Sequence, residues 1–308
     1  MNNLISVIVP LCNEEGNVAQ MAERLTKVFV SALPKMKYEV IFIDDGSTDG
    51  TRAILEKLSA QNSNLTSIFF RRNFGKAAAL AAGFRHAKGD VIVTIDGDLQ
   101  DPPEEIPQMI AKLNEGYDLV SGWKKMRKDP LEKRLPSKIF NGIVSSLFDI
   151  PLHDFNCGFK VYRAWCVKNV TLSGSLYRFL PVFVAKQGGK ITELPISHQK
   201  RMSGKSKYGM GRYLQGLFDV ITMLFISKFY YRPMHFFALV ALPILFIGAL
   251  LTAYLVGSHI YWLASGDISF QLVNRPLLVI GLAMLGLGLN VILIGALSEF
   301  LLQLNAGD

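Results

Sequence analysis

Two long apolar segments near the end of the chain constrain its fold more than any other feature. Residues 234–257 and 276–298 run for 24 and 23 residues without Asp, Glu, Lys or Arg. A helix needs about 20 residues to cross the hydrocarbon of a bilayer, so each segment is long enough to span one. With 50% hydrophobic and 19% charged residues, the chain is too apolar for a wholly soluble protein and too charged for a bundle of membrane helices alone. We therefore expect a soluble part joined to a membrane part.

Basic charge is concentrated directly before these spans. Residues 121–232 carry 20 Lys and Arg against 6 Asp and Glu, whereas residues 233–308 carry 1 against 3. This placement indicates a surface that faces anionic lipid head groups on the cytoplasmic side. Nucleic acid is the rival partner for a basic patch, but the patch adjoins membrane spans and contains no recognised nucleic-acid motif. We expect no nucleic-acid partner.

The charges that flank the spans also predict an orientation. Lys228 and Arg232 precede the first span, and the connection between the spans has no Lys or Arg before Arg275. The positive-inside rule then places the N-terminal part in the cytosol and the short connection outside. The prediction is a multi-pass protein of the cytoplasmic (inner) membrane.

Upstream of the spans, buried strands alternate with helices. Apolar runs that predict strands end in polar clusters, and helical periodicity follows them, as at Val18, Met21, Leu25 and Val28. The expected strands are residues 4–11, 40–43, 65–70, 91–95 and 188–196. This alternation predicts an α/β fold with a doubly wound, mostly parallel sheet. A dinucleotide-binding domain is disfavoured because no Gly-x-Gly-x-x-Gly follows the first strand.

Ligands of such sheets bind outside the carboxyl ends of the strands. The polar clusters around Glu14, Asp44, residues 71–76 and Asp96 all follow predicted strands, so they should meet in one crevice. The sequence Asp96-Gly-Asp-Leu-Gln-Asp101 places two carboxylates one residue apart and adds an amide oxygen. Such oxygens suit Mg²⁺ or Mn²⁺, which substrate phosphates then complete. The alternative is an ordinary polar turn, because Asp-Gly is common turn chemistry.

Several motifs in a fixed order make the chain resemble a known family. They are Pro10-Leu-Cys-Asn-Glu-Glu15, Asp44-Asp-Gly-Ser-Thr-Asp-Gly-Thr51, Arg72-Asn-Phe-Gly-Lys76 and Asp96-Gly-Asp-Leu-Gln-Asp-Pro-Pro-Glu104. Together they resemble family 2 glycosyltransferases of the GT-A fold. More narrowly, the set is similar to polyprenyl-phosphate glycosyltransferases, such as dolichol-phosphate mannose synthases and bacterial undecaprenyl-phosphate glucosyltransferases. The resemblance covers about residues 4–210.

The resemblance implies roles for the residues that bind the donor. It assigns Pro10, Glu14 and Asp44 to the nucleoside of a nucleotide sugar, and Lys76 also to the donor. It assigns Asp96, Asp98 and Gln100 to the metal, with Asp96 also at the diphosphate. The implied cofactor is Mg²⁺ or Mn²⁺.

Acceptor residues follow from later motifs. The resemblance implies that Arg134 and Ser137 bind the acceptor phosphate and that Asp154 lies beside it. Because a phosphate monoester is already largely dianionic above its second pKa of about 6, Asp154 should orient the acceptor more than remove a proton. Arg201 and Lys207 match Arg-x-x-Gly-x-Ser-Lys and would offset charge on the leaving diphosphate.

Three further segments carry structural expectations. The basic run 124–130 is either a mobile loop over the site or an ordinary solvated loop. The apolar positions of 139–148 repeat at helical spacing and suit packing on the sheet and lying in the membrane interface equally well. Residues 214–225 predict an interfacial helix. The expected parts are a catalytic domain at 1–210, an interfacial amphipathic helix at 211–232 and a membrane domain at 233–308.

The predicted function is inverting transfer of a hexose, glucose from UDP-glucose, to polyprenyl (undecaprenyl) phosphate. A processive polysaccharide synthase shares the early motifs, but the chain has no Gln-x-x-Arg-Trp and only two spans. A non-catalytic, nucleotide-binding membrane recruiter is the other alternative, and the intact Asp96 and Asp98 count against it. Asn290 and the glycines of the second span suit helix–helix packing, including packing between copies in a homo-oligomer.

Overall fold

The computed structural model describes residues 4–125, 131–168, 170, 174, 176–197, 218, 220–225, 229, 232–266 and 275–305, with the side chains of 131–139 and 305 outside this description. The chain divides into two compact units, Met1–Val220 and Ile221–Asp308. The boundary therefore falls within the predicted interfacial segment 211–232, most of which lies outside the described residues.

The first unit is built on a seven-stranded sheet in the order β3-β2-β1-β4-β6-β5-β7. All neighbouring pairs are parallel except β4–β6 and β5–β6, because β6 runs antiparallel to both of its neighbours. The predicted mostly parallel α/β sheet is confirmed, and the antiparallel β6 is an addition to it. The strands are β1 Leu4–Leu11, β2 Lys37–Asp44, β3 Leu65–Phe69, β4 Val91–Thr94, β5 Leu119–Trp123, β6 Lys160–Arg163 and β7 Ile191–Pro195.

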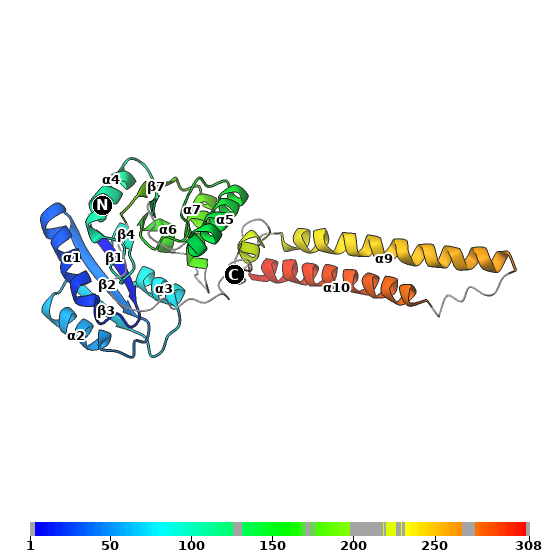
Figure 1. Cartoon of the computed structure of the whole chain (residues 1–308), viewed down its shortest axis with the longest axis horizontal. Helices are drawn as coiled ribbons and strands as arrows, with labels where there is room; N and C mark the ends of the chain where they lie inside the picture. Colours follow the sequence, from blue (N-terminus) through cyan, green and yellow to red (C-terminus); the bar gives the residue numbers. More distant parts are fainter. Residues whose placement is uncertain are drawn as a thin grey trace. The chain divides into compact units, whose positions relative to one another are not determined.

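Helices cover both faces of this sheet (Figure 1). One apolar core joins the sheet to α1 (Val18–Ala32), α2 (Thr51–Gln61) and α4 (Ile106–Asn114), which follows the short 3₁₀ helix η1 (Pro103–Glu105). The other joins it to α3 (Lys76–His86), α6 (Trp165–Lys168) and α7 (Leu180–Lys186). Successive strand residues point to opposite faces, so Val7 and Val9 enter the first core and Ile8 enters the second. This division is why the strands read as continuous apolar runs.

Helix α5 (Leu131–Phe148) belongs to the first unit and packs against its 3₁₀ helix η2 (Leu176–Phe179). The rings of Phe140 and Phe148 contact Phe179 of η2, with centroids 6.0 and 6.4 Å apart, and Val144 is fully buried. Ile143 is 48% exposed. The apolar face of α5 thus packs against η2. Contact of its outer face, which carries Ile143, with lipid stays a prediction.

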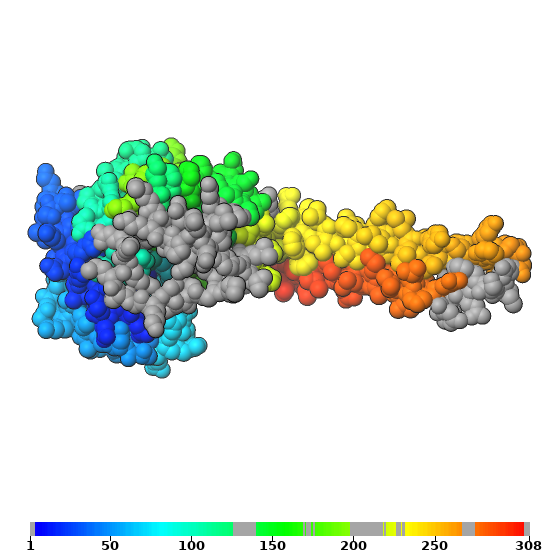
Figure 2. All heavy atoms as spheres, viewed as in Figure 1, coloured from blue at the N-terminus to red at the C-terminus, as the bar shows by residue number. Residues whose placement is uncertain are grey.

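The second unit contains the two apolar helices α9 (Pro233–Ala264) and α10 (Pro276–Asn305), which lie side by side (Figure 2). Both are long and apolar enough to cross a membrane. Gly281, Gly288 and Gly295 of α10, seven residues apart, face α9 so closely that a Cβ would lie 2.5–2.6 Å from its side chains. Glu299 Oε2 accepts a hydrogen bond from Met234 N at 3.1 Å, at the first turn of α9. Three of the four glycines predicted to pack are therefore used within the chain.

Candidate active site

The loops after β1 and β2 are joined by hydrogen bonds. Asn13 N donates to Ser47 Oγ at 2.8 Å, and Glu14 N donates to Thr51 Oγ1 at 2.9 Å. Glu15 Oε2 accepts from Gly50 N at 2.8 Å. The Glu14 carboxylate itself accepts from Asn17 Nδ2 at 2.6 Å, which holds it at the start of α1. The two polar motifs that follow the first strands thus form one continuous rim at the carboxyl end of the sheet.

Asp44 and Asp45 anchor this rim to the loop after β3. Asp44, the last residue of β2, is 2% exposed and accepts from Ser47 N at 3.0 Å through Oδ1. Asp45 accepts from the backbone nitrogens of Phe74 and Gly75 at 2.7 and 2.9 Å. Buried carboxylates on backbone N–H groups form strong charge-assisted bonds. Asp45 therefore fixes the position from which α3 starts.

Gly46 permits the close approach of these loops. Its φ of +68° is a conformation that side-chain-bearing residues rarely adopt, and a Cβ there would lie 2.3 Å from the backbone carbon of Arg72. The Gly in the Asp-Asp-Gly motif is therefore required both by its conformation and by the passing chain.

Asp96 lies where these loops meet the end of β4. Its carboxylate forms an ion pair with Lys76 Nζ at the first residue of α3. The same ammonium lies 5.3 Å from the centre of the Tyr177 ring, in η2. Against Asp96 lies the backbone of Gly158, because a Cβ built there would be 2.6 Å from both carboxylate oxygens. The start of α3 and the loop before β6 therefore both lie against this carboxylate.

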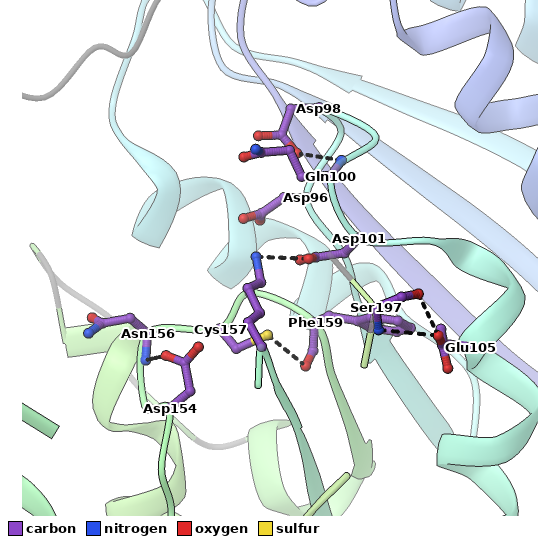
Figure 3. A network of polar contacts seen from close by, with 12 residues as sticks. Asp96, Asp98, Gln100, Asp101, Glu105, Asp154, Asn156, Cys157, Phe159 and Ser197 are labelled. Carbon is purple, nitrogen blue, oxygen red and sulfur yellow. Dashed lines mark hydrogen bonds and ion pairs between the residues drawn. The ribbon is translucent and has the colours of Figure 1, made fainter. Parts of the chain in front are cut away.

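Asp98 and Gln100 lie on the same loop as Asp96, residues 96–101, which we call the acidic loop. Leu99 between them is buried with a φ of +58°, and Asp98 Oδ1 accepts from Gln100 N at 3.2 Å. Figure 3 shows Asp96, Asp98 and Gln100 together, on a loop opposite the one that carries Asp154 and Asn156. Carboxylate and amide oxygens fit Mg²⁺ or Mn²⁺, and the Lys76 ammonium already marks a cation position at Asp96. The donor set therefore fits the implied metal.

The described residues contain no group of three or more His, Cys, Asp or Glu side chains arranged to hold a metal. A Mg²⁺ ion usually takes only one or two protein carboxylates and completes its shell with water and substrate phosphates. The site is thus suited to a metal that arrives with a phosphate ligand.

The position of Lys124 differs from the one expected from the sequence. The sequence placed it in an exposed basic loop, but its side chain is 10% exposed and its Nζ lies 2.8 Å from Oδ1 of the fully buried Asp101. Burial by itself disfavours the ammonium ion, yet attraction to Asp101 and to other nearby groups, including Asp96, outweighs it and raises the pKa of Lys124. A buried ion pair therefore ties the end of the acidic loop to the residue that follows β5.

The loop before β6 presents Asp154. This residue is 3% exposed, and its Oδ1 accepts from Asn156 N at 3.1 Å. Asn141 of α5 donates to the carbonyl of His153 at 2.9 Å, and Glu193 of β7 accepts from His153 N at 2.7 Å. The loop that carries Asp154 is thus tied to α5 and to β7 through His153, an arrangement suited to orienting a neighbour.

Lys160 supports the same loop from below. Its ammonium, 3% exposed, donates to the carbonyls of Cys157 and, at 3.2 Å, of Phe155. Burial lowers the pKa of Lys160 and raises the pKa of the Cys157 thiol to about 12. Cys157, which is 1% exposed, is therefore part of the apolar core.

The structure brings together part of the predicted site. Pro10 pairs with Ile43 at the end of β1, beside Glu14 and Asp44, and Lys76 joins the Asp96 loop. The backbone of Arg134 and Ser137 belongs to α5, while their side chains, like Arg201 and Lys207 entirely, lie outside the described residues. Sequence reasoning missed Asp101, Lys124 and Gly158. Only the position of Lys124 directly after a strand hinted that it was buried.

Residues 6–169 match the profile of glycosyl transferase family 2, more than half of the chain. The chain belongs to this family. Dodecaprenyl-phosphate galacturonate synthase of Rhizobium johnstonii is 35% identical over 96% of this chain and 87% of its own length. Undecaprenyl-phosphate 4-deoxy-4-formamido-L-arabinose transferase of Shewanella sediminis is 32% identical over 93% of this chain and 86% of its own. Both alignments are long enough to reach into the apolar helices.

Solved structures confirm the fold of this family 2 glycosyltransferase. Glucosyl-3-phosphoglycerate synthase from Mycobacterium tuberculosis, solved with Mn²⁺, UDP and phosphoglyceric acid, has a TM-score of 0.57 at 18% identity and covers 72% of this chain and 78% of its own. The same protein with Mn²⁺ and UDP-glucose gives a TM-score of 0.54 at 17% identity and covers 73% of this chain and 78% of its own. The predicted GT-A type of sheet is thereby confirmed.

Replacing Gly158 should disable this glycosyltransferase. In Gly158→Ala the added methyl would lie 2.6 Å from both oxygens of Asp96, so the carboxylate must move. Because misplacement by about 1 Å can cost about a hundredfold in rate, we expect a fall of that order in sugar transfer. Gly142→Ala is the control, since a Cβ there has nothing within 4 Å among the described residues. Equal activity of the two variants would contradict the close approach.

Proposed function

We propose that this glycosyltransferase moves one sugar from a nucleotide diphosphate sugar onto the phosphate of a polyprenyl lipid at a membrane. The observation that carries the proposal is the length of the two alignments, over 96% and 93% of the chain, to proteins named for transfer to dodecaprenyl and undecaprenyl phosphate. Alignments of this length reach into the apolar helices as well as covering most of the first unit. A lipid acceptor would explain these helices, because they would hold the enzyme at the membrane that contains the acceptor.

The donor we propose is a UDP-hexose, with UDP-glucose as its first candidate. In support, the glucosyl-3-phosphoglycerate synthase of similar fold binds UDP-glucose. The two relatives are named for galacturonate and for 4-deoxy-4-formamido-L-arabinose, which makes an anionic sugar and a formamido sugar the competitors to be tested.

In the proposed mechanism the chain holds both substrates in line. Pro10, Glu14 and Asp44 form the rim that would receive the nucleoside, and Asp96, Asp98 and Gln100 would hold the metal. A bound Mg²⁺ or Mn²⁺ supplies neutralising charge to the diphosphate as it leaves. Asp154, fixed by its loop, would orient the acceptor phosphate, whose oxygen attacks the anomeric carbon and inverts it.

The remaining assignments concern side chains outside the described part of the chain. We propose that Arg134 and Ser137 bind the acceptor phosphate and that Arg201 and Lys207 offset the charge of the leaving group. Ser197 leads into that second segment, and its hydroxyl donates to Glu105 Oε1 at 2.7 Å, directly after the acidic loop.

The membrane arrangement that we propose follows from the flanking charges. The catalytic domain, residues 1–210, would lie in the cytosol, with an interfacial helix at 211–232 and two spans within 233–308. Homo-oligomers remain part of the proposal: Gly286, unlike its three neighbours, has nothing within 4 Å of a built Cβ among the described residues.

The test is transfer of radiolabelled sugar to undecaprenyl phosphate in detergent, with Mn²⁺ or Mg²⁺. The panel contains UDP-glucose, UDP-galacturonate and UDP-4-deoxy-4-formamido-L-arabinose. We expect a single-sugar lipid from one donor, lost on chelation with EDTA and restored by metal. Polymer would instead identify a processive synthase. Nucleotide binding without any lipid product would identify a recruiter.

A further inference from the structure

Two lysines approach the acidic loop, and they differ in how firmly they are held. Lys124 is 10% exposed and its partner Asp101 is fully buried. The Lys76 and Asp96 side chains are 22% and 31% exposed. Partly exposed ion pairs contribute little stability, whereas separating a buried pair leaves an uncompensated charge. Of the two pairs, only that of Lys76 is suited to exchange.

The surroundings of Asp96 leave little room for a second cation. One oxygen already contacts the Lys76 ammonium, and the backbone of Gly158 lies against both oxygens. A divalent ion and an ammonium at one carboxylate also repel each other. A metal that binds Asp96 must therefore displace Lys76.

A displaced Lys76 ammonium has two alternative surroundings, the Tyr177 ring and a phosphate at the start of α3. Its ammonium already lies 5.3 Å from the centre of the Tyr177 ring, a contact that attracts a cation to the ring face. Lys76 is also the first residue of α3, whose first turn contains no acidic residue. The start of a helix favours anions, so lysine and helix would act on the same phosphate.

We propose that Lys76 is a placeholder cation. Without metal, Lys76 neutralises Asp96. When a divalent metal arrives with a nucleotide diphosphate, Lys76 gives up Asp96 to the metal and pairs with the diphosphate. This role depends on the proposed function in one respect, namely that Asp96 is a ligand of the divalent metal. Its consequence is that metal binds weakly alone and well together with the nucleotide.

The test measures binding of Mn²⁺ to the full-length protein in detergent, from the electron paramagnetic resonance signal of free Mn²⁺. In Lys76→Met the competitor is gone, so we expect Mn²⁺ alone to bind about threefold or more tightly, the scale set by a partly exposed pair. Lys76→Arg should stay near the wild type. Lys112→Met, which removes the same charge from the exposed pair with Glu115, should also leave Mn²⁺ binding unchanged.

The second arm adds UDP. With Mn²⁺ present, Lys76→Met should bind UDP about tenfold more weakly, because a charge-assisted contact to phosphate is lost. A merely structural lysine would lower both affinities, so opposite changes identify the placeholder. Thermal unfolding checks that the variant is folded, and Lys76→Gln gives the same readouts if it is not.

Two failures are distinguishable. Unchanged or weaker binding of Mn²⁺ alone in Lys76→Met, with normal binding of Mn²⁺ and UDP by the wild type, would overturn the placeholder role and leave the proposed function standing. Failure of the wild type to bind Mn²⁺ even with UDP would overturn the metal assignment, and the placeholder role with it.

Discussion

Asp98→Asn is expected to lower sugar transfer by about a thousandfold while the protein stays folded. The substitution keeps the shape of the side chain and an oxygen to accept the bond from Gln100 N at 3.2 Å, but removes the charge that would hold the metal. Metal stabilisation of a leaving diphosphate is worth several kcal/mol, and each 1.4 kcal/mol or so is tenfold in rate. The measurement is the initial rate of radiolabel transfer at saturating Mn²⁺.

The control for this variant is Asp149→Asn, which removes the same charge from an exposed residue after α5. Asp149 has a φ of +54°, which Asn tolerates, so neither activity nor stability should change. The melting temperature of Asp98→Asn should stay close to that of the wild type. Retention of more than about a tenth of the activity would refute metal ligation by Asp98, because a lost ligand costs far more.

Lys124→Met should lower the free energy of unfolding of the first unit by about 3–5 kcal/mol, the cost of breaking a buried ion pair on one side. Asp101 is fully buried and lies 2.8 Å from the lysine, so its carboxylate would be left without its counter-ion. Urea unfolding followed by the tryptophan signal measures the change. Because the acidic loop rests on this pair, the variant should also lose activity.

A double variant separates the pair from the packing. Lys124→Met with Asp101→Leu removes both charges, and replacing a buried pair by apolar residues is often neutral, so we expect most of the lost stability to return. If the double variant were as unstable as Lys124→Met, Lys124 would stabilise the protein through packing of its aliphatic stem and not through its charge.

The pH dependence of this stabilisation has a definite sign. The pKa of Lys124 is raised in the folded protein above its ordinary value of 10.5, so its contribution is complete below that value and is lost only as the pH rises through the folded pKa. The stability difference between the wild type and the double variant Lys124→Met/Asp101→Leu, which carries neither charge, should therefore stay level between about pH 6 and pH 9, well below the ordinary lysine pKa.

Local sequence was sufficient to predict the parallel core of the fold. Strands buried on both faces are apolar at every position, so β1, β2 and β4 were visible as runs. Carboxyl ends of parallel strands meet at one edge, so the clusters after those strands were predicted to share a crevice, and the structure places Glu14, Asp44 and Asp96 at that edge of the sheet. The two apolar helices followed from length alone.

Tertiary structure decided which charges meet. Lys76 and Asp96 are 20 residues apart and pair only because the Asp45 carboxylate fixes the start of α3 beside the end of β4. The antiparallel insertion of β6 beside β4 carries Gly158 to Asp96, and nothing local in the sequence announces an inserted strand. Lys124 was expected in a basic loop, either mobile over the site or simply solvated, but β5 delivers it to the buried Asp101. Sequence thus determined which residues were available at the edge of the sheet, whereas strand order determined their partners, because contacts between distant segments depend on the whole topology.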